Sequence, residues 1–308
     1  MHNMNDYLAT APFDLYELSL FHLVVKHRSF TKAAEAAGVT QSAITRQMQG
    51  MEDSLGIDLL ERTTRSVRIT KAGEFLFQES IKLLGDVDQS LRRLKEDFAN
   101  ARKEIRVGVS RSIGLAYLPG FFHANLKHNH NVSYRVSYQS SSEILTALEA
   151  NELDVGVMCP PPRLPRTAFI THKFADEFTI IAPLDVAKNF RSLAKSRDAR
   201  DNWFRKQSWL LLEESTNTGR ELRRWMFQSG LKVEPAMQLD SFDLIITLVS
   251  LGMGVSLVPK RALALYGQKK TLARLPMKNC FERELVVVMR RHRKKPEHLA
   301  KFVENILF

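Results

Sequence analysis

The chain has 308 residues, of which 44% are hydrophobic and 26% are charged, and its formal net charge is +11. This composition excludes a disordered or fibrous protein and indicates about two globular domains. The two cysteines are too few for a disulfide framework or a cysteine-based zinc site, and no apolar run approaches the roughly 18 residues of a membrane span, so we expect a cytoplasmic protein without membrane contact.

The basic and acidic residues are distributed unevenly along the chain. Residues 1–100 carry 12 basic and 14 acidic side chains, whereas residues 101–308 carry 33 basic and 20 acidic ones. A basic surplus favours an acidic partner such as nucleic acid. If the N-terminal third binds DNA, it must therefore use a local basic patch rather than its overall charge.

Residues 15–55 show the pattern of a helix-turn-helix. Residues 31–37 are rich in alanine and stop at Gly38, and Thr40 can cap a second helix over residues 41–55. A short helix, a tight turn with glycine and a second helix form the motif that places the start of its second helix in a DNA major groove.

The polar side chains of this motif, from Phe30 to Gln49, are the expected DNA contacts. Glutamine can pair with two groups on adenine at once, and serine or threonine can reach base edges or phosphates. The residues assigned to this contact are Thr31, Thr40, Gln41, Ser42, Thr45, Arg46 and Gln49. The alternative is a packed helical pair with a solvated polar face.

A basic segment follows the second helix. Residues 62–71 contain no acid, and Val67 and Ile69 alternate with polar residues, which predicts a short two-stranded wing. Arginine side chains on such a wing suit phosphate or minor-groove contact. The residues assigned to this contact are Arg62, Thr63, Thr64, Arg65 and Arg68.

Residues 71–100 predict one long helix with an apolar seam. Leu84, Val87, Leu91, Leu94 and Phe98 follow the 3,4 spacing of a coiled coil, so we expect them to form a dimer interface. Paired helices would place two helix-turn-helix domains side by side on a pseudo-palindromic DNA site. The alternative is a helix that packs on its own chain.

Strands and helices alternate after residue 101, which predicts parallel sheets covered by helices. The expected fold class is therefore α+β multidomain, with a winged helix-turn-helix at 13–70, a linker helix at 71–100 and a two-lobed α/β domain at 101–308. We place lobe I at about 101–182 and 277–308, and lobe II at about 183–276.

Hydroxyl side chains stand where several of these strands end and the next helix begins. Ligands of open α/β sheets lie beyond the carboxyl ends of strands, and helix N-termini favour anions, so we expect a small anionic effector such as a carboxylate in the cleft between the lobes. The alternative for each serine is a plain helix cap. The residues assigned to effector binding are Ser110, Ser112, Ser140, Ser141, Thr216, Ser241 and Phe242.

Enzymatic and cofactor sites find little support in the sequence. It contains no phosphate-binding loop and no nucleophile elbow, and we expect no metal, no cofactor and no catalytic residue. Cys159 lacks a resolving partner, which favours an inert thiol over a redox sensor. An exported solute-binding protein is a further alternative, but residues 1–15 do not resemble an export signal.

The segments AAEAAGVTQSAIT, MEDSLGIDLLER and RITKAG carry a specific resemblance. Over about residues 13–73 the chain resembles the winged helix-turn-helix of LysR-type transcriptional regulators, except that Ser42 and Thr45 replace the proline and serine that the family often has. Residues 101–308 resemble the family's effector-binding domain, which has a periplasmic-binding-protein fold. The resemblance implies dimerisation through the linker helix, assembly into a tetramer, and contact with RNA polymerase that the effector modulates.

Overall fold

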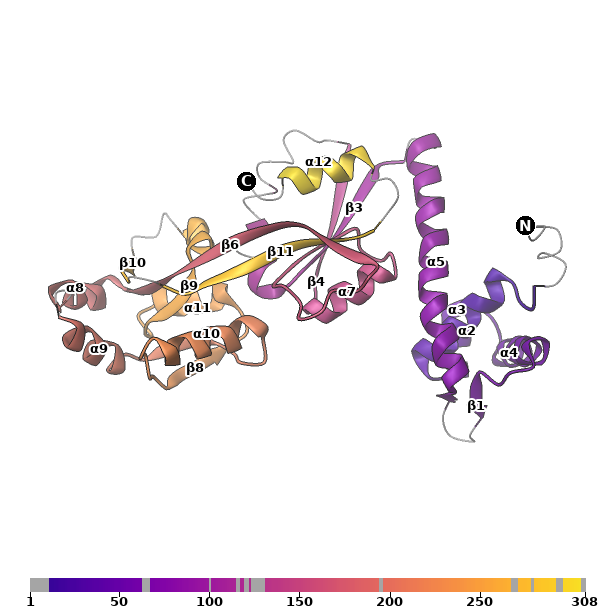
Figure 1. Cartoon of the computed structure of the whole chain (residues 1–308), viewed down its shortest axis with the longest axis horizontal. Helices are drawn as coiled ribbons and strands as arrows, with labels where there is room; N and C mark the ends of the chain where they lie inside the picture. The colour runs from indigo at the N-terminus through magenta and orange to yellow at the C-terminus, as the bar shows by residue number, and fades with distance from the viewer. Residues whose placement is uncertain are drawn as a thin grey trace. The chain divides into compact units, whose positions relative to one another are not determined.

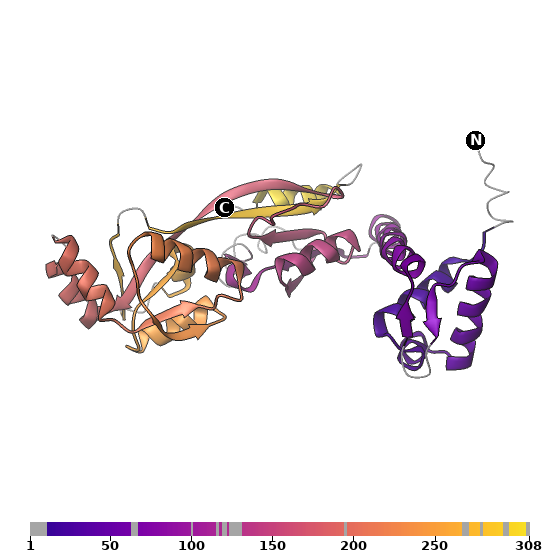
Figure 2. The same ribbon diagram turned by 60° about the horizontal axis from the view of Figure 1, so that its bottom comes forward.

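The structure is a computed structural model. The residues that it describes are 11–62, 67–99, 101–114, 117–118, 122, 131–193, 196–266, 271–277, 280–291 and 296–305. They form two compact units, Met1–Ala101 with Glu149–Glu152, and Arg102–Leu148 with Leu153–Phe308 (Figures 1 and 2). No helix within these ranges is both long enough and apolar enough to cross a membrane.

The first unit is a winged helix-turn-helix followed by one long helix, as the sequence predicts. Its elements are α2 (Leu15–His27), α3 (Phe30–Ala37), α4 (Gln41–Leu55), β1 (Leu60–Arg62), β2 (Val67–Ile69) and α5 (Lys71–Phe98). The core forms where α2, α3 and α4 cross, and the small side chains of Ala33 and Ala34 let two helices approach closely. Strands β1 and β2 pair antiparallel as the wing.

Side-chain caps fix where the helices of this unit begin. Ser29 caps α3, Thr40 caps α4 and Thr70 caps α5. Both α3 and α4 end at a glycine in the left-handed region, with φ of 68° at Gly38 and 64° at Gly56. Glycine adopts this conformation without steric cost, so the turn between α3 and α4 is encoded locally.

The second unit has two α/β lobes. Its elements in chain order are β3 (Lys103–Val109), β4 (Val132–Tyr138), α7 (Ser141–Glu149), β5 (Val155–Met158), β6 (Ala168–Pro183), α8 (Leu184–Leu193), α9 (Arg197–Arg205), β7 (Trp209–Leu212), α10 (Asn217–Gln228), β8 (Pro235–Leu239), α11 (Phe242–Ser250), β9 (Ser256–Pro259), the 3-10 helix η1 (Lys260–Tyr266), β10 (Leu272–Leu275), β11 (Glu282–Arg290) and α12 (Glu297–Asn305).

A single seven-stranded sheet runs through both lobes in the order β10-β6-β11-β5-β3-β4, with β9 also paired to β6. Strand β3 is parallel to β4 and β5, and β11 is antiparallel to β5 and β6. The first lobe contains β3, β4, β5, α7 and α12. The second contains the elements from α8 to β10, including the parallel pair β7 and β8.

Two long strands join the lobes. The first half of β6 pairs with β11 in the first lobe, and its second half pairs with β9 and β10 in the second lobe (Figure 1). The core of the second lobe includes Phe178, Ile180, Ile181, Ala182 and Phe281. The change of lobe therefore falls within β6 near residue 178, rather than after residue 182 as the sequence suggested.

The sequence pattern missed parts of the second unit. The apolar run FTIIA predicts a strand over 178–182 alone, but β6 begins at Ala168. Its first half alternates partly buried and exposed polar residues such as Lys173, so it lacks the apolar run of its buried second half. Helices α8 and α9 were not expected at all. Helical residues follow β3 at the described positions 111–114, 117–118 and 122.

Candidate functional site

The outer face of α4 is a polar surface. Gln41, Ser42, Thr45, Arg46 and Gln49 line a shallow hollow of about 450 Å³. The opposite face carries Ile44, Met48 and Met51, which are buried in the core of the first unit. The 3.6-residue period therefore separates a packing face from a face that solvent can reach, as a recognition helix requires.

Hydrogen bonds at the start of α4 hold this surface in place. The Thr40 hydroxyl accepts the Ala43 N–H at 3.2 Å, and the Thr45 hydroxyl donates to the Gln41 carbonyl at 2.9 Å. Thr31 on α3 donates to the Gln41 side-chain oxygen at 3.3 Å. The helix-turn-helix residues that the sequence assigned to DNA thus lie at or beside the exposed start of α4, except Gln49, which is on the same face in the third turn. The assignment itself stays a prediction.

A buried glutamate connects α4 to the wing. The Glu52 carboxylate, on a residue that is 8% exposed, accepts the N–H groups of Leu59 and Leu60 at 2.8 and 2.9 Å. This residue was not singled out from the sequence, although its position three residues before the end of α4 could have suggested a cap for the next strand. Its two hydrogen bonds hold the start of β1 against the end of α4.

The expected wing contacts are only partly covered by the structure. Arg68 is exposed on β2. The side chain of Arg62 and the residues Thr63, Thr64 and Arg65 lie outside the described residues. Their predicted contact with DNA therefore stays a prediction.

Helix α5 carries a stripe of exposed apolar side chains. Val87, Leu91, Leu94 and Phe98 are 36, 53, 56 and 80% exposed. Leu84, which was expected to continue this stripe, instead packs partly buried against the core of its own unit. Four of the five expected dimerisation residues thus form a surface without cover, and it is this apolar surface that a second helix would have to bury.

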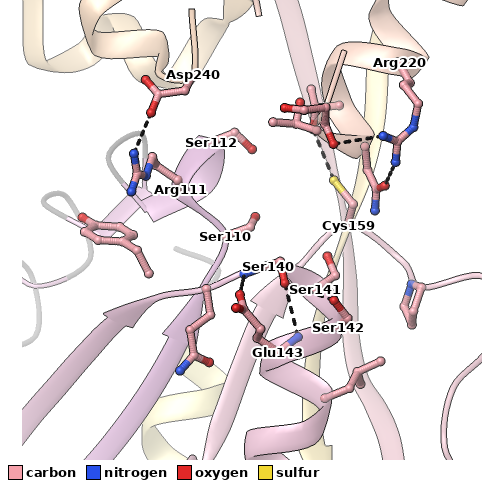
Figure 3. A pocket seen from close by; sticks show the side chains of 18 of the residues that line it. Ser110, Arg111, Ser112, Ser140, Ser141, Ser142, Glu143, Cys159, Arg220 and Asp240 are labelled. Carbon is pink, nitrogen blue, oxygen red and sulfur yellow. Dashed lines mark hydrogen bonds and ion pairs between the residues drawn. The ribbon is translucent and has the colours of Figure 1, made fainter. Parts of the chain in front are cut away.

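A cavity of about 880 Å³ lies between the lobes of the second unit (Figure 3). Five of the expected effector residues line it, namely Ser110, Ser112, Ser140, Ser141 and Thr216. Ser241 and Phe242 are not among its described lining residues. The Ser241 hydroxyl caps α11 by accepting the Leu244 N–H, and Phe242 is 3% exposed in the core of the second lobe.

Two of the helices at this cavity begin with capping serine or threonine. Ser140 and Glu143 form a capping box: the Ser140 N–H donates to the Glu143 carboxylate at 2.7 Å, and the Glu143 N–H donates to the Ser140 hydroxyl at 3.3 Å. The Ser140 N–H, and then the Ser140 side chain, lower the pKa of the Glu143 carboxyl by hydrogen bonding to it. Thr216 caps α10 by accepting the Gly219 N–H at 2.9 Å. Both helices therefore begin at the cavity.

A buried ion pair lies beneath the cavity. Arg283 donates to the Asp176 carboxylate at 2.8 Å, and both side chains are 0% exposed. The same guanidinium donates to the Ser112 hydroxyl and carbonyl of the first lobe, each at 3.1 Å, and to the Thr218 hydroxyl of the second lobe at 2.6 Å. Arg283 thus connects both lobes to the strands that join them.

A second, exposed ion pair bridges the lobes at the cavity. Arg111, two residues after the end of β3, donates to the carboxylate of Asp240, directly after β8, at 2.6 Å. Their side chains are 61 and 47% exposed. Figure 3 shows the two side chains pointing toward one another from opposite sides. Neither residue was assigned to the site from sequence, although each lies next to a residue that was.

The cysteines are placed as isolated thiols. Cys159 is 5% exposed, lines the cavity and lies 3.5 Å from the Thr218 hydroxyl. Cys280 is partly buried, and burial raises the pKa of its thiol. In the part of the chain that the structure describes, no three His, Cys, Asp or Glu side chains are grouped as a metal would need.

Comparisons with known proteins match both units. Residues 15–74 match the family model described as "Bacterial regulatory helix-turn-helix protein, lysR family", and residues 99–307 match "LysR substrate binding domain". The HTH-type transcriptional regulator BenM of Acinetobacter baylyi is 29% identical over 251 residues, 80% of each chain. The RuBisCO operon transcriptional regulator of Allochromatium vinosum is 25% identical over 299 residues, 95% of each.

A solved structure shows the same fold. Full-length CbnR complexed with its target DNA superposes with a TM-score of 0.64 at 21% identity, and the alignment covers 96% of this chain and 99% of that one. At this level of identity the likeness concerns the fold, and the individual contacts of this chain need their own evidence.

Proposed function

Because the chain belongs to the LysR family of DNA-binding transcriptional regulators, whose helix-turn-helix and effector-binding domains it contains, we propose that it places α4 in the major groove of its operator and responds to a small anion bound between the lobes. The observation that carries the proposal is the exposed polar face of α4, held by its caps. Its site of action is then the chromosome, in the cytoplasm.

The DNA contact can be tested by binding to duplexes that the protein itself selects from a random pool. Affinity should fall steeply with salt because Lys and Arg contacts release counterions from the DNA. Gln41→Ala should relax base preference and weaken specific binding by about 10- to 100-fold, the range for one bidentate base contact. Gln228→Ala, an exposed glutamine of α10, is the matched control. Equal affinity for selected and unselected DNA would contradict the proposal.

We further propose that α5 forms the dimer through Val87, Leu91, Leu94 and Phe98, and that dimers associate into a tetramer. The exposed apolar stripe supports the dimer. Leu91→Glu should shift the sedimentation profile toward monomer, because it sets a charge in the seam. Gln89→Glu introduces the same side chain on the other side of the helix and should leave the profile unchanged. A Leu91→Glu variant that stays dimeric would refute this interface.

The anionic effector is supported by the polar ends that meet at the cavity. Helices α7 and α10 begin there, and helix N-termini favour negative charge. The buried Ser110 hydroxyl has no hydrogen-bond partner within the described residues. Titration calorimetry with a panel of small carboxylates should identify a ligand whose affinity Ser110→Ala and Ser141→Ala reduce. Ser250→Ala, outside the lining residues, should not reduce it, and unchanged affinity in all three variants would place the ligand elsewhere.

The output step is also a proposal. Effector binding changes the closure of the lobes, and this alters how the oligomer contacts RNA polymerase at the promoter. Transcription with purified polymerase should depend on the protein, on its selected DNA and on the ligand together. Ligand-independent output would reject the coupling while leaving DNA binding intact.

A further inference from the structure

The basic surplus of the second unit does not extend to its pocket. Residues 101–308 have 13 more basic than acidic side chains, yet the described lining of the cavity contains three arginines and three acids. The overall charge therefore does not explain what the pocket selects. The arrangement of these six charges does.

The first lobe presents a positive wall. Its charged lining residues are Arg111, Arg163 and Glu143. The Glu143 carboxylate is engaged by the Ser140 N–H at 2.7 Å, so its charge serves the start of α7. The charges of this lobe that remain for a ligand are those of the two arginines.

The second lobe presents a negative wall. Its charged lining residues are Glu213, Asp240 and Arg220. Arg220 donates to the carbonyl groups of Glu214 and Ser215 at 3.1 and 2.9 Å, so it stabilises the loop before α10. Glu213 and Asp240 follow β7 and β8, which are adjacent parallel strands, so the two carboxylates leave the same edge. The Glu213 carboxylate accepts the Ser215 hydroxyl at 2.5 Å, so Asp240 is the acid of this wall that remains for a ligand. The cleft thus has opposite polarity on its two sides.

From this polarity, and resting on the effector pocket proposed above, we infer that the effector is a small zwitterion of the α-amino acid class. Its carboxylate binds Arg111 and the hydroxyl-rich first lobe, and its ammonium group binds Asp240. In the structure Arg111 and Asp240 pair with one another at 2.6 Å across the cleft. The zwitterion replaces this ion pair with two charge-assisted contacts, one between its carboxylate and Arg111 and one between its ammonium group and Asp240.

A simple anion fits this pair less well. It can bind the remaining N–H groups of Arg111, since only one guanidinium nitrogen donates to Asp240, but the Asp240 carboxylate then faces the ligand's own negative charge. An amine alone would bind Asp240 and would leave the Arg111 guanidinium facing the ligand's own positive charge. The existing pair is about half exposed, and exposed pairs contribute little to stability, so a ligand that satisfies both charges displaces it easily. Selection therefore comes from the need to satisfy both charges at once.

The test uses the full-length protein and matched pairs of probes. The twenty common L-α-amino acids are screened beside the corresponding 2-hydroxy acids, which keep the carboxylate and lack the ammonium group. Binding is followed by thermal shift and by tryptophan fluorescence, because Trp203, Trp209 and Trp225, the three tryptophans of the chain, all lie in the second unit. We expect one or a few amino acids to bind, and their hydroxy analogues to bind at least about tenfold more weakly.

Charge variants then assign the two contacts. Asp240→Asn should weaken binding of the amino acid by about 10- to 100-fold and strengthen binding of the hydroxy acid, because the carboxylate that repels it is gone, whereas Arg111→Gln should weaken binding of both. Asp240→Glu should restore part of the preference. Glu284→Gln breaks an equally exposed ion pair, Lys173–Glu284, outside the cavity lining, and should change neither affinity.

The outcomes separate this inference from the proposed function. The zwitterion would be overturned if hydroxy acids bind as well as amino acids, or if Asp240→Asn leaves the affinity for the amino acid unchanged. If Ser110→Ala and Ser141→Ala still weaken binding in that case, the anion pocket is retained. A screen in which no amino acid binds also overturns the zwitterion. A ligand whose binding none of these pocket variants alters would overturn both.

Discussion

The polar face of α4 comes from residues 41–49 of one helix, whereas the cavity of the second unit gathers residues from Ser110 to Asp240 on both lobes. The face needs only a capped helix with one packed side. The cavity needs two lobes held in a defined position by β6, β11 and the ion pair beneath it. A local site should therefore tolerate change in the rest of the molecule better than a site assembled from distant segments.

The largest effect expected from this difference is that of removing Arg283. Arg283→Met leaves the Asp176 carboxylate buried and unpaired, which should destabilise the second unit by about 3–5 kcal/mol. Urea unfolding followed by tryptophan fluorescence measures this unit. Asp176→Asn in the same chain should recover part of the loss.

The control for Arg283 lies on the same two strands. Lys173→Met breaks the exposed pair between β6 and β11, which should cost about 0–1 kcal/mol. Equal costs for the two variants would mean that the buried pair does not hold the lobes together. DNA binding by α4 should survive in both.

The corresponding element of the first unit is Glu52. Glu52→Ala removes the acceptor of two N–H groups that start β1, and leaving buried donors unsatisfied should destabilise this unit by about 1–3 kcal/mol. Amide hydrogen exchange in α2 and α4 measures the loss. The exposed Glu35→Ala on α3 is the control, and equal protection in both variants would show that water replaces the carboxylate.

Alanine substitutions at two glycines compare how well each site tolerates an added side chain. A Cβ at Gly219, at the start of α10, would lie 2.0 Å from the Glu213 carbonyl oxygen, whereas one at Gly50 on α4 would meet nothing within 4 Å. We expect Gly219→Ala to destabilise the second unit by about 1–3 kcal/mol and Gly50→Ala to stabilise the first by about 0.5–1 kcal/mol. Denaturant unfolding of each unit gives both values. If both substitutions change the free energy of unfolding in the same direction, the expected difference between the two sites is contradicted.

These differences also explain what could be predicted from the sequence. The helix-turn-helix was predictable because caps such as Thr40 and stops such as Gly38 act within a few residues. Of the cavity, only hydroxyls at strand ends such as Ser110 were found, since a strand end is visible locally. Arg283 and Asp240 were missed because their roles depend on partners more than a hundred residues away in sequence.

The smallest expected effect concerns pH and the first unit alone. His22 on α2 stacks on Phe77 of α5 at 5.0 Å, and its Nδ1 lies 3.2 Å from the Ser80 hydroxyl. Burial, and then the charge of Lys26, lower the pKa of His22 from its usual 6.5. The unfolded chain therefore binds a proton more readily, so the stability of this unit is complete above about pH 6.5 and falls as the pH drops through that value toward the folded pKa.

Hydrogen exchange in α2 at about pH 7.5 and about pH 5.5, corrected for intrinsic rates, should show this loss. His22→Phe keeps the ring contact and should remove the pH dependence, whereas His27→Gln, exposed at the end of the same helix, should leave it. A pH dependence that survives in His22→Phe would assign it to another group.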